Sequence, residues 1–293
     1  MQKVTRPRRS VLYMPGSNER ALEKARGLPA DCLILDLEDA VSPEAKDFAR
    51  TQVAAALRAG HYGHREVAVR VNAIDSPWFA EDIAAAATCG ADALLLPKVE
   101  SPKTLKESVR LMSKAGAPAD MAIWIMTETP RGVLELQDII ADQPRLAVIV
   151  MGTSDLAKEL RIEASVDRTG LVQALSHSVL CARAQGLDII DGVHLALGDE
   201  AGLRKACEQG KALGFDGKSL IHPEQIAAAN EIFGISDTAA EAAREIVTAW
   251  KQARARGEGI TVVNGRLIEQ LHVDEAERTL KIHTAIQDIQ AGE

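Results

Sequence analysis

The chain has 293 residues, of which 46% are hydrophobic and 26% charged, so it can bury a large core and we expect a globular protein. Its 42 acidic residues outnumber the 34 basic ones, and because the basic residues form no stripe, the sequence argues against a nucleic-acid partner. The apolar stretch after the basic N-terminus stops at Pro15-Gly16, and no stretch reaches the roughly 18 apolar residues of a membrane span. We therefore expect a cytoplasmic protein with no membrane partner.

Eight short apolar runs alternate with longer stretches of helical period. Each run is apolar nearly throughout, as expected of a strand that is buried on both faces of a parallel sheet. Strands that alternate with helices in this way predict βα units. The predicted strands are residues 10–14, 32–37, 66–71, 93–96, 121–127, 146–151, 187–190 and 215–221.

Four of the intervening helices have a recognisable start, where Pro occupies the first helical position. Ser and Thr in front of Pro also predict N-caps, and Gly at the other end predicts a left-handed residue that ends the helix. The start signals are Ser42-Pro43, Ser101-Pro102, Thr129-Pro130 and His222-Pro223, and the closing glycines are Gly60, Gly116, Gly186 and Gly214.

Eight βα repeats in about 235 residues predict an α/β fold, a (β/α)₈ TIM barrel, over residues 1–233. A doubly wound sheet is less favoured, because it would show fewer strands and a GxGxxG turn after the first one. Residues 234–293 instead predict a helix at 236–256, a strand at 260–263, a turn at Asn264-Gly265 and a last helix from about 272 to 289. This segment is too thin to stand alone, so we expect a C-terminal lid or oligomerisation segment that packs on the barrel or on a neighbouring subunit.

Residues just past the carboxyl ends of barrel strands line the active-site mouth. In this sequence those positions are unusually polar and charged, although exposed charges normally favour the outer faces of helices. The predicted rim consists of Tyr13, the Pro15-Gly16-Ser17 turn, Asp36, Glu38, Asp39, Arg70, Asn72, Lys98, Glu128, the loop 152–155, Asp191, Lys218, Ser219 and His222.

The carboxylates of this rim indicate a hard cation bound by oxygen. No set of two or three histidines accompanies them, so zinc is disfavoured, whereas Mg²⁺ accepts two carboxylates and completes its shell with water and substrate. Glu128 and Asp155, on neighbouring strands, are the predicted ligands, and a structural ion pair is the alternative for either one alone. The four cysteines, Cys32, Cys89, Cys181 and Cys207, stand far apart and are expected to be buried thiols without disulfide or metal.

Cationic residues of the rim have two further predicted roles. Arg70 ends an apolar strand and has the fork geometry to bind a substrate carboxylate, while a salt bridge to Asp36 or Glu38 is the alternative. Arg20 and Lys24 lie one turn apart on the helix after the first strand, where they could bind phosphates, although a solvated helix face would look the same.

The sequence contains linked motifs along almost its whole length: RRSVLYMPGSNERALEK, LILDLEDAV, VRVN, LLLPKVES, ETPRGV, MGTSDLAKEL and FDGKSLIHPEQI. In order and spacing they resemble the citrate lyase β-subunit-like family of the HpcH/HpaI aldolase superfamily, which includes malyl-CoA and citramalyl-CoA lyases and malyl-CoA thioesterases. The resemblance implies a homotrimer or hexamer whose C-terminal segment covers a neighbour's site. It also implies Mg²⁺ on Glu128 and Asp155 and a substrate carboxylate on Arg70. The residues implied to contact CoA or substrate are Tyr13, Arg20, Lys24, Ile190 and Asp191.

In lyases of this family, a tail carboxylate exchanges a proton with the enolate carbon that forms when the carbon–carbon bond breaks. The corresponding segment is Gly265-Arg266-Leu267-Ile268-Glu269, with Glu where the lyases place Asp. One extra methylene moves the carboxylate by about an ångström, a displacement that can cost about a hundredfold in rate. The malyl-CoA thioesterases resemble this chain in the tail, and Glu269 would suit a general base for hydrolysis.

The leading hypothesis is a Mg²⁺-dependent carbon–carbon lyase that cleaves a 3-hydroxy-dicarboxylyl-CoA thioester of the malyl, citramalyl or citryl type. The alternative is a (3S)-malyl-CoA thioesterase, which releases malate and CoA. Glu269, Arg70, Glu38 and Asp39 are the candidate catalytic residues. A non-catalytic subunit is disfavoured by the complete polar rim, and an aldolase without CoA would not need Arg20 and Lys24. The acyl group, and whether CoA or an acyl carrier bears the thioester, stay open.

Overall fold

The computed structural model describes residues 6–163, 165 and 167–292. Contacts within the chain divide it into two compact units. The first is Arg8–Ile232, and the second comprises the rest of the described chain, in which Arg6 and Pro7 are grouped with the C-terminal segment. The division at Phe233 lies next to the domain boundary expected from the sequence.

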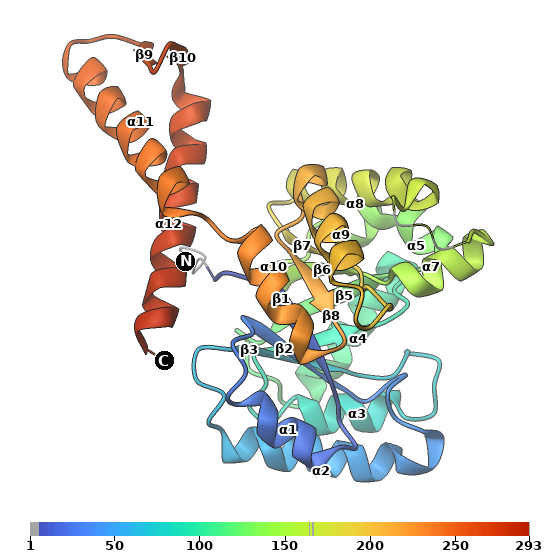
Figure 1. Cartoon of the computed structure of the whole chain (residues 1–293). Coiled ribbons are helices and arrows are strands. Elements are labelled where there is room, and N and C mark those ends of the chain that lie inside the picture. Colours follow the sequence, from blue (N-terminus) through green and yellow to red (C-terminus); the bar gives the residue numbers. More distant parts are fainter. Residues whose placement is uncertain (1–5, 164, 166, 293) are drawn as a thin grey trace. The chain divides into compact units, whose positions relative to one another are not determined.

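Eight parallel strands form a closed barrel in the order of the chain, each hydrogen-bonded to the next and β8 to β1 (Figure 1). The (β/α)₈ barrel predicted from the sequence is therefore confirmed, with strand ends that differ by at most two residues. The largest difference is at β8, because the N–H of Phe215 still bonds to Gly210 of the preceding helix. The strands are β1 Ser10–Pro15, β2 Cys32–Asp36, β3 Glu66–Arg70, β4 Ala93–Leu96, β5 Ala122–Thr127, β6 Leu146–Met151, β7 Asp188–Asp191 and β8 Gly217–Leu220.

Helices surround the strands and follow the predicted start and stop signals. Ser101 and Thr129 cap their helices through side-chain oxygens and His222 caps its 3₁₀ turn through its ring, whereas Ser42 makes no such bond. The four predicted closing glycines all have positive φ. The α-helices are α1 Glu19–Ala25, α2 Lys46–Ala59, α3 Phe79–Ala86, α4 Pro102–Lys114, α5 Pro130–Leu134, α6 Leu136–Ile140, α7 Thr153–Leu160, α8 Val172–Ala184, α9 Glu200–Leu213 and α10 Ile226–Phe233, with 3₁₀ turns η1 Pro43–Ala45, η2 Thr169–Leu171 and η3 Pro223–Gln225.

Side chains from the strands fill the barrel interior, so the barrel is a packed core and not a channel. Its amino-terminal end is closed by Arg8, whose guanidinium lies 5.7 Å from the centre of the Trp124 ring. The Arg8 Nε and Nη2 atoms donate to Glu66 at 2.7 and 2.9 Å, and Nη1 donates to Asp188. This buried ion cluster joins the beginnings of β1, β3 and β7 and leaves the opposite end of the barrel for chemistry.

The C-terminal unit consists of two long helices, α11 Asp237–Ala255 and α12 Gln270–Gly292, joined by a hairpin of β9 Thr261–Val263 and β10 Arg266–Ile268. Figure 1 shows the hairpin at one end of the helix pair and the C-terminus at the other. Asn264 and Gly265 both have positive φ, as a two-residue hairpin turn requires. A small core of Trp250, Ile268 and Val273 holds the hairpin against the helices. The two predicted helices, the strand and the turn are present, and the structure adds β10.

All four cysteines are buried thiols that form no disulfide, as predicted. Within the ranges that the structure describes, no helix has the length and apolar character needed to cross a membrane.

Candidate active site

At the carboxyl end of the barrel, Asp36 and Arg70 are direct partners in the register of β2 and β3. The Nε and Nη2 atoms of Arg70 each donate to one oxygen of Asp36 at 2.6 Å, and both side chains are buried. Burial alone would raise the pKa of Asp36, but the charge and the hydrogen bonds of Arg70 lower it below its ordinary value. Asp36 therefore occupies two of the three guanidinium nitrogens of Arg70. This ion pair is the salt bridge that the sequence left as an alternative.

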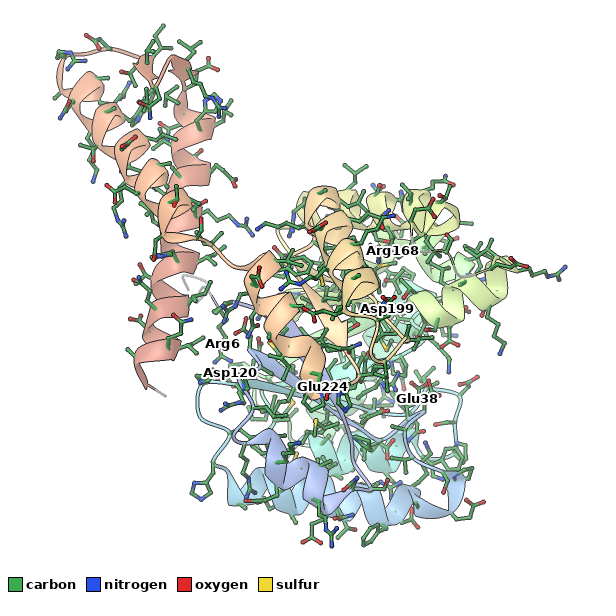
Figure 2. The ribbon with its side chains drawn as sticks, viewed as in Figure 1. Arg6, Glu38, Asp120, Arg168, Asp199 and Glu224 are labelled. Atoms are coloured by element: carbon green, nitrogen blue, oxygen red, sulfur yellow. The ribbon has the colours of Figure 1, made fainter. Side chains whose placement is uncertain are left out.

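The remaining nitrogen of Arg70 faces two more carboxylates. Its Nη1 atom lies 3.1 Å from Oε2 of Glu38 and 3.7 Å from Asp39, and its guanidinium lies 4.9 Å from the centre of the Tyr13 ring. Glu38, labelled in Figure 2, accepts a hydrogen bond from the Lys98 ammonium through Oε1 at 3.0 Å. Burial raises the pKa of Glu38 despite these two cations. Glu38 is buried between Arg70 and Lys98, whereas Asp39 is exposed at the mouth.

Glu128 lies just past β5 and is only 2% exposed. Its Oε1 atom accepts a hydrogen bond from the backbone N–H of Lys98 at 2.8 Å. A Cβ atom on Gly152 would come within 2.6 Å of its Oε2 atom, so glycine at this position makes room for the carboxylate. Burial, and then the nearby charge of Glu38, raise the pKa of Glu128 to about 8. The carboxylate is thus held in place, and its burial together with the charge of Glu38 outweighs the charge of Arg70, which favours the ionised form.

Asp155 lies in the first turn of α7, on the loop that follows β6, and lines the same cavity as Glu128. This cavity has a volume of about 330 Å³ and is also lined by Tyr13, Asp36, Asp39 and Arg70. The structure therefore brings the two predicted metal ligands and the predicted carboxylate-binding arginine into one pocket. Their roles stay predictions.

The donor set of this pocket fits a hard divalent cation. Among the described residues, no three His, Cys, Asp or Glu side chains are grouped as a complete metal site. Glu128 and Asp155 alone would leave most of an octahedral shell open, as Mg²⁺ sites that also bind substrate do. The charge of the cation would also offset the mutual repulsion of Glu128 and Glu38, which raises the pKa of Glu128.

Two other predicted ligand contacts, Ile190 and Asp191, are not among the residues that line this pocket. Ile190 belongs to the buried barrel core, and the Asp191 side chain is 0% exposed. Asp191 accepts hydrogen bonds from Lys218 at 2.9 Å and from Arg168, labelled in Figure 2, at 2.7 and 2.8 Å. From the segment after β7, Val193 lines the pocket instead. Asp191 is thus the centre of a buried ion cluster, and contact of either residue with a ligand stays a prediction.

The predicted phosphate-binding pair lies on the first helix after β1. Arg20 and Lys24 are both exposed on α1, and Asn18 caps this helix by accepting a hydrogen bond from Ala21 at 3.1 Å. Both cations are therefore accessible to an anionic ligand.

Glu269 lies between β10 and α12 and is exposed. Its backbone is fixed at the start of α12, because its carbonyl accepts from the N–H of His272 at 3.0 Å and its own N–H donates to Nδ1 of His272 at 3.1 Å. The backbone of Glu269 is thereby held while its carboxylate faces solvent, as a group that acts on an external ligand would require.

Sequence reasoning missed Lys46, which does not line the pocket but holds residues of the site in place. Its buried ammonium donates to the carbonyls of Leu37 and Glu38 and to Oδ1 of Asn72, at 2.8, 2.7 and 2.7 Å. These bonds fix the loop that carries Glu38 and Asp39. No local signal marks Lys46, because it stands at the start of α2 among other polar residues and its partners are distant in sequence.

Comparisons with known proteins agree with this geometry. The HpcH/HpaI aldolase/citrate lyase family matches residues 9–223. A (3S)-malyl-CoA thioesterase of Cereibacter sphaeroides is 45% identical over 292 residues, which cover 100% of both chains. The citrate lyase subunit beta of Escherichia coli is 34% identical over 95% of this chain and 94% of the relative. The crystal structure of CitE from Mycobacterium tuberculosis in complex with magnesium, acetoacetate and coenzyme A has a TM-score of 0.73 at 26% identity, covering 95% of this chain and 98% of that one.

Proposed function

The chain belongs to the HpcH/HpaI aldolase/citrate lyase family, and on that premise we propose that it hydrolyses a short acyl-CoA thioester, (3S)-malyl-CoA, to malate and CoA. The observation that carries the proposal is the 45% identity with a (3S)-malyl-CoA thioesterase across the full length of both chains, the tail included. The exposed carboxylate of Glu269, fixed at the start of α12, supplies a candidate base for this reaction.

Glu128 and Asp155 would hold Mg²⁺ in the pocket. Mg²⁺, when bound, supplies positive charge that neutralises the acyl-group oxygens as negative charge develops on them. The bond from the Lys98 N–H leaves Oε2 of Glu128 available, and Gly152 leaves room beside it. The excess of carboxylates around the pocket supports a cation at this position.

Arg70 would orient the free carboxylate of the malyl group. Because Asp36 holds Nε and Nη2, the nitrogen that remains for the substrate is Nη1, which faces Glu38 and Asp39. Asp39 is exposed and its oxygen is 3.7 Å from Nη1, so a substrate carboxylate could take its place. Asp36 would keep the guanidinium plane fixed while this exchange occurs.

CoA would lie along α1, with its phosphates on Arg20 and Lys24. Both side chains are exposed on one face of a helix that begins at the mouth of the barrel. Tyr13, near the end of β1, lines the pocket, and its ring lies 4.9 Å from the Arg70 guanidinium, which suits contact with the acyl end.

Glu269 would act as the general base in the site of a neighbouring copy, within a homotrimer or hexamer. Its carboxylate takes a proton from water, the water oxygen attacks the thioester carbonyl carbon, and the carbon–sulfur bond breaks as the tetrahedral adduct collapses. The proton then passes to the leaving thiolate, so that malate and CoA are formed. The hairpin exposes an apolar cross-strand pair, Val262 and Leu267, which supports docking against another surface.

Carbon–carbon cleavage is the second candidate, favoured by the 34% identity with a citrate lyase subunit beta. In that reaction the hydroxyl proton passes to water, the bond between the hydroxyl-bearing carbon and the thioester α-carbon breaks, and its electron pair forms the enolate. Glu269 would then protonate the enolate carbon. The products would be a 2-oxo acid and an acyl-CoA.

The two reactions differ in whether a thiol is released. With malyl-CoA and Mg²⁺, hydrolysis yields free CoA thiol and malate, whereas cleavage yields glyoxylate and acetyl-CoA without free thiol. We expect thiol release and malate in equal amounts. Glyoxylate without thiol would make the protein a lyase, and turnover of neither kind would reject malyl-CoA as its substrate.

Action of Glu269 across subunits can be tested by mixing two inactive variants, Glu128→Gln and Glu269→Ala, under conditions that allow subunit exchange. If a site combines the barrel of one copy with the tail of another, some sites in mixed oligomers carry neither lesion and activity returns. If each site is built from one chain, every site keeps one lesion. No recovery after verified exchange would therefore contradict action between subunits.

A further inference from the structure

The backbone of Lys98 has a conformation that lysine rarely adopts. Its φ angle is +50°, in the left-handed region, directly after Pro97 at the end of β4. Such a residue persists only where the surrounding structure determines its conformation, and these residues concentrate at functional sites. The conformation of Lys98 therefore calls for a local explanation.

The left-handed turn aims the N–H of Lys98 at a carboxylate. This N–H donates to Oε1 of Glu128 at 2.8 Å, and Glu128 is 2% exposed. A side chain on Gly152 would come within 2.6 Å of the other oxygen, Oε2, so Oε2 faces the loop that begins at Gly152 and carries Asp155. One oxygen of Glu128 is thus fixed by Lys98, and the other is turned towards the second carboxylate of the pocket.

The side chain of Lys98 contacts a different strand end. Its ammonium donates to Oε1 of Glu38 at 3.0 Å, although 42% of the side chain is exposed. Lys98 therefore connects the carboxyl ends of β2 and β5 through one residue. The exposed side chain could be changed without opening the core, whereas the backbone contact depends on the left-handed conformation itself.

We propose that Lys98 is a positioning residue whose left-handed backbone fixes Glu128 so that its Oε2 atom faces a divalent cation shared with Asp155. The inference rests on the proposed function in one respect, the presence of that cation. It adds that the geometry of the metal site is set by a backbone conformation at the end of β4, and that the ammonium of Lys98 is not needed for it.

Two substitutions separate the backbone from the ammonium. Asn and Thr both remove the positive charge, but Asn adopts the left-handed region readily whereas β-branched Thr does not. The electron paramagnetic resonance signal of free Mn²⁺ is lost when the ion binds. The size of this loss therefore measures the affinity of the metal site without any substrate. Circular dichroism melting curves establish that each variant is folded, and Lys98→Val is the second β-branched variant should Lys98→Thr fail to fold.

Lys98→Asn should bind Mn²⁺ with an affinity close to that of the wild type, and Lys98→Thr should bind at least about tenfold more weakly, as loss of a hydrogen bond to a charged group predicts. Equal affinities of the Asn and Thr variants would overturn the inference. If the Asn and Thr variants bind equally well while the wild type binds Mn²⁺ and Glu128→Gln does not, only the role of Lys98 is rejected. If the wild type binds no Mn²⁺, the metal assignment itself fails, and the positioning role with it.

Discussion

The two ends of the barrel each bury a cluster of charges, but the clusters are balanced differently. At the amino-terminal end Arg8 donates to both Glu66 and Asp188 and lies against Trp124. At the carboxyl end the pocket and its surroundings contain five carboxylates and three cations: Asp36, Glu38, Asp39, Glu128 and Asp155 with Arg70, Lys98 and Lys46. Arg8 bonds directly to both carboxylates of its cluster and so contributes to stability, whereas at the carboxyl end burial and the charge of Glu38 raise the pKa of Glu128, so that this end is suited to bind a cation.

The largest effect on turnover is expected from substitutions at the carboxyl end of the barrel. Glu128→Gln and Asp155→Asn should each lower turnover by about 10³-fold, because each removes one of only two anionic metal ligands. Steady-state rates at limiting Mg²⁺ measure this, and melting curves should show the fold intact. Retention of more than about a tenth of the activity in either variant would remove that residue from the metal site.

The opposite outcome is expected for the amino-terminal cluster. Arg8→Met should lower the free energy of unfolding by about 3–5 kcal/mol, because it leaves the buried carboxylate of Glu66 and the half-buried carboxylate of Asp188 without their partner. The turnover number per folded molecule should stay unchanged, since Arg8 is at the end of the barrel away from the pocket. Denaturant unfolding with parallel kinetics tests both statements, and a loss of turnover without a loss of stability would contradict the division between the two ends.

The same substitution at both ends sharpens the comparison. Arg70→Lys should lower kcat/KM by about a hundredfold, because an ammonium cannot hold Asp36 and a substrate carboxylate in one plane. Arg8→Lys is the matched control, and it should change the melting temperature but not kcat/KM. Near-normal kinetics for Arg70→Lys would mean that Arg70 is only an ion-pair partner of Asp36.

The smallest effect on the kinetics is expected from substitutions on α1. Replacing both Arg20 and Lys24 by Ala should raise KM for the thioester by about tenfold and leave kcat nearly unchanged, because contacts remote from the reacting bond supply uniform binding. A double substitution of Arg110 and Lys114 on α4 removes the same charge from another helix and should leave KM unaltered. If the two double variants behave alike, the α1 pair does not bind the phosphates of CoA.

The fold was readable from the sequence because the strands and helix ends depend on local patterns. A strand buried on both faces is apolar throughout, as in β4, and glycines such as Gly214 mark helix ends by their φ. Glu128 and Asp155 could be chosen for a similar reason, since positions after barrel strands converge. The strand list even placed Asp36 and Arg70 at the ends of neighbouring strands.

What the sequence did not reveal depends on contacts between distant residues. The sequence offered a salt bridge of Arg70 to Asp36 or Glu38 as an alternative, but the pairing of both Asp36 oxygens with Arg70 follows from the register of β2 and β3, which no local pattern fixes. Lys46 acts through Leu37 and Asn72, and Arg8 through Glu66 and Asp188, across gaps in sequence that periodicity does not span. The left-handed conformation of Lys98 is equally hidden, because lysine is not a residue that favours it.

The contrast between the two barrel ends is tested most directly by calorimetric titration of Mg²⁺ into the metal-stripped protein. The wild type and a Glu66→Gln variant should each bind Mg²⁺ at one site per chain, and Glu128→Gln should bind none. Binding that survives in Glu128→Gln, or that disappears in a folded Glu66→Gln variant, would contradict the assignment of the cation to the carboxyl end of the barrel.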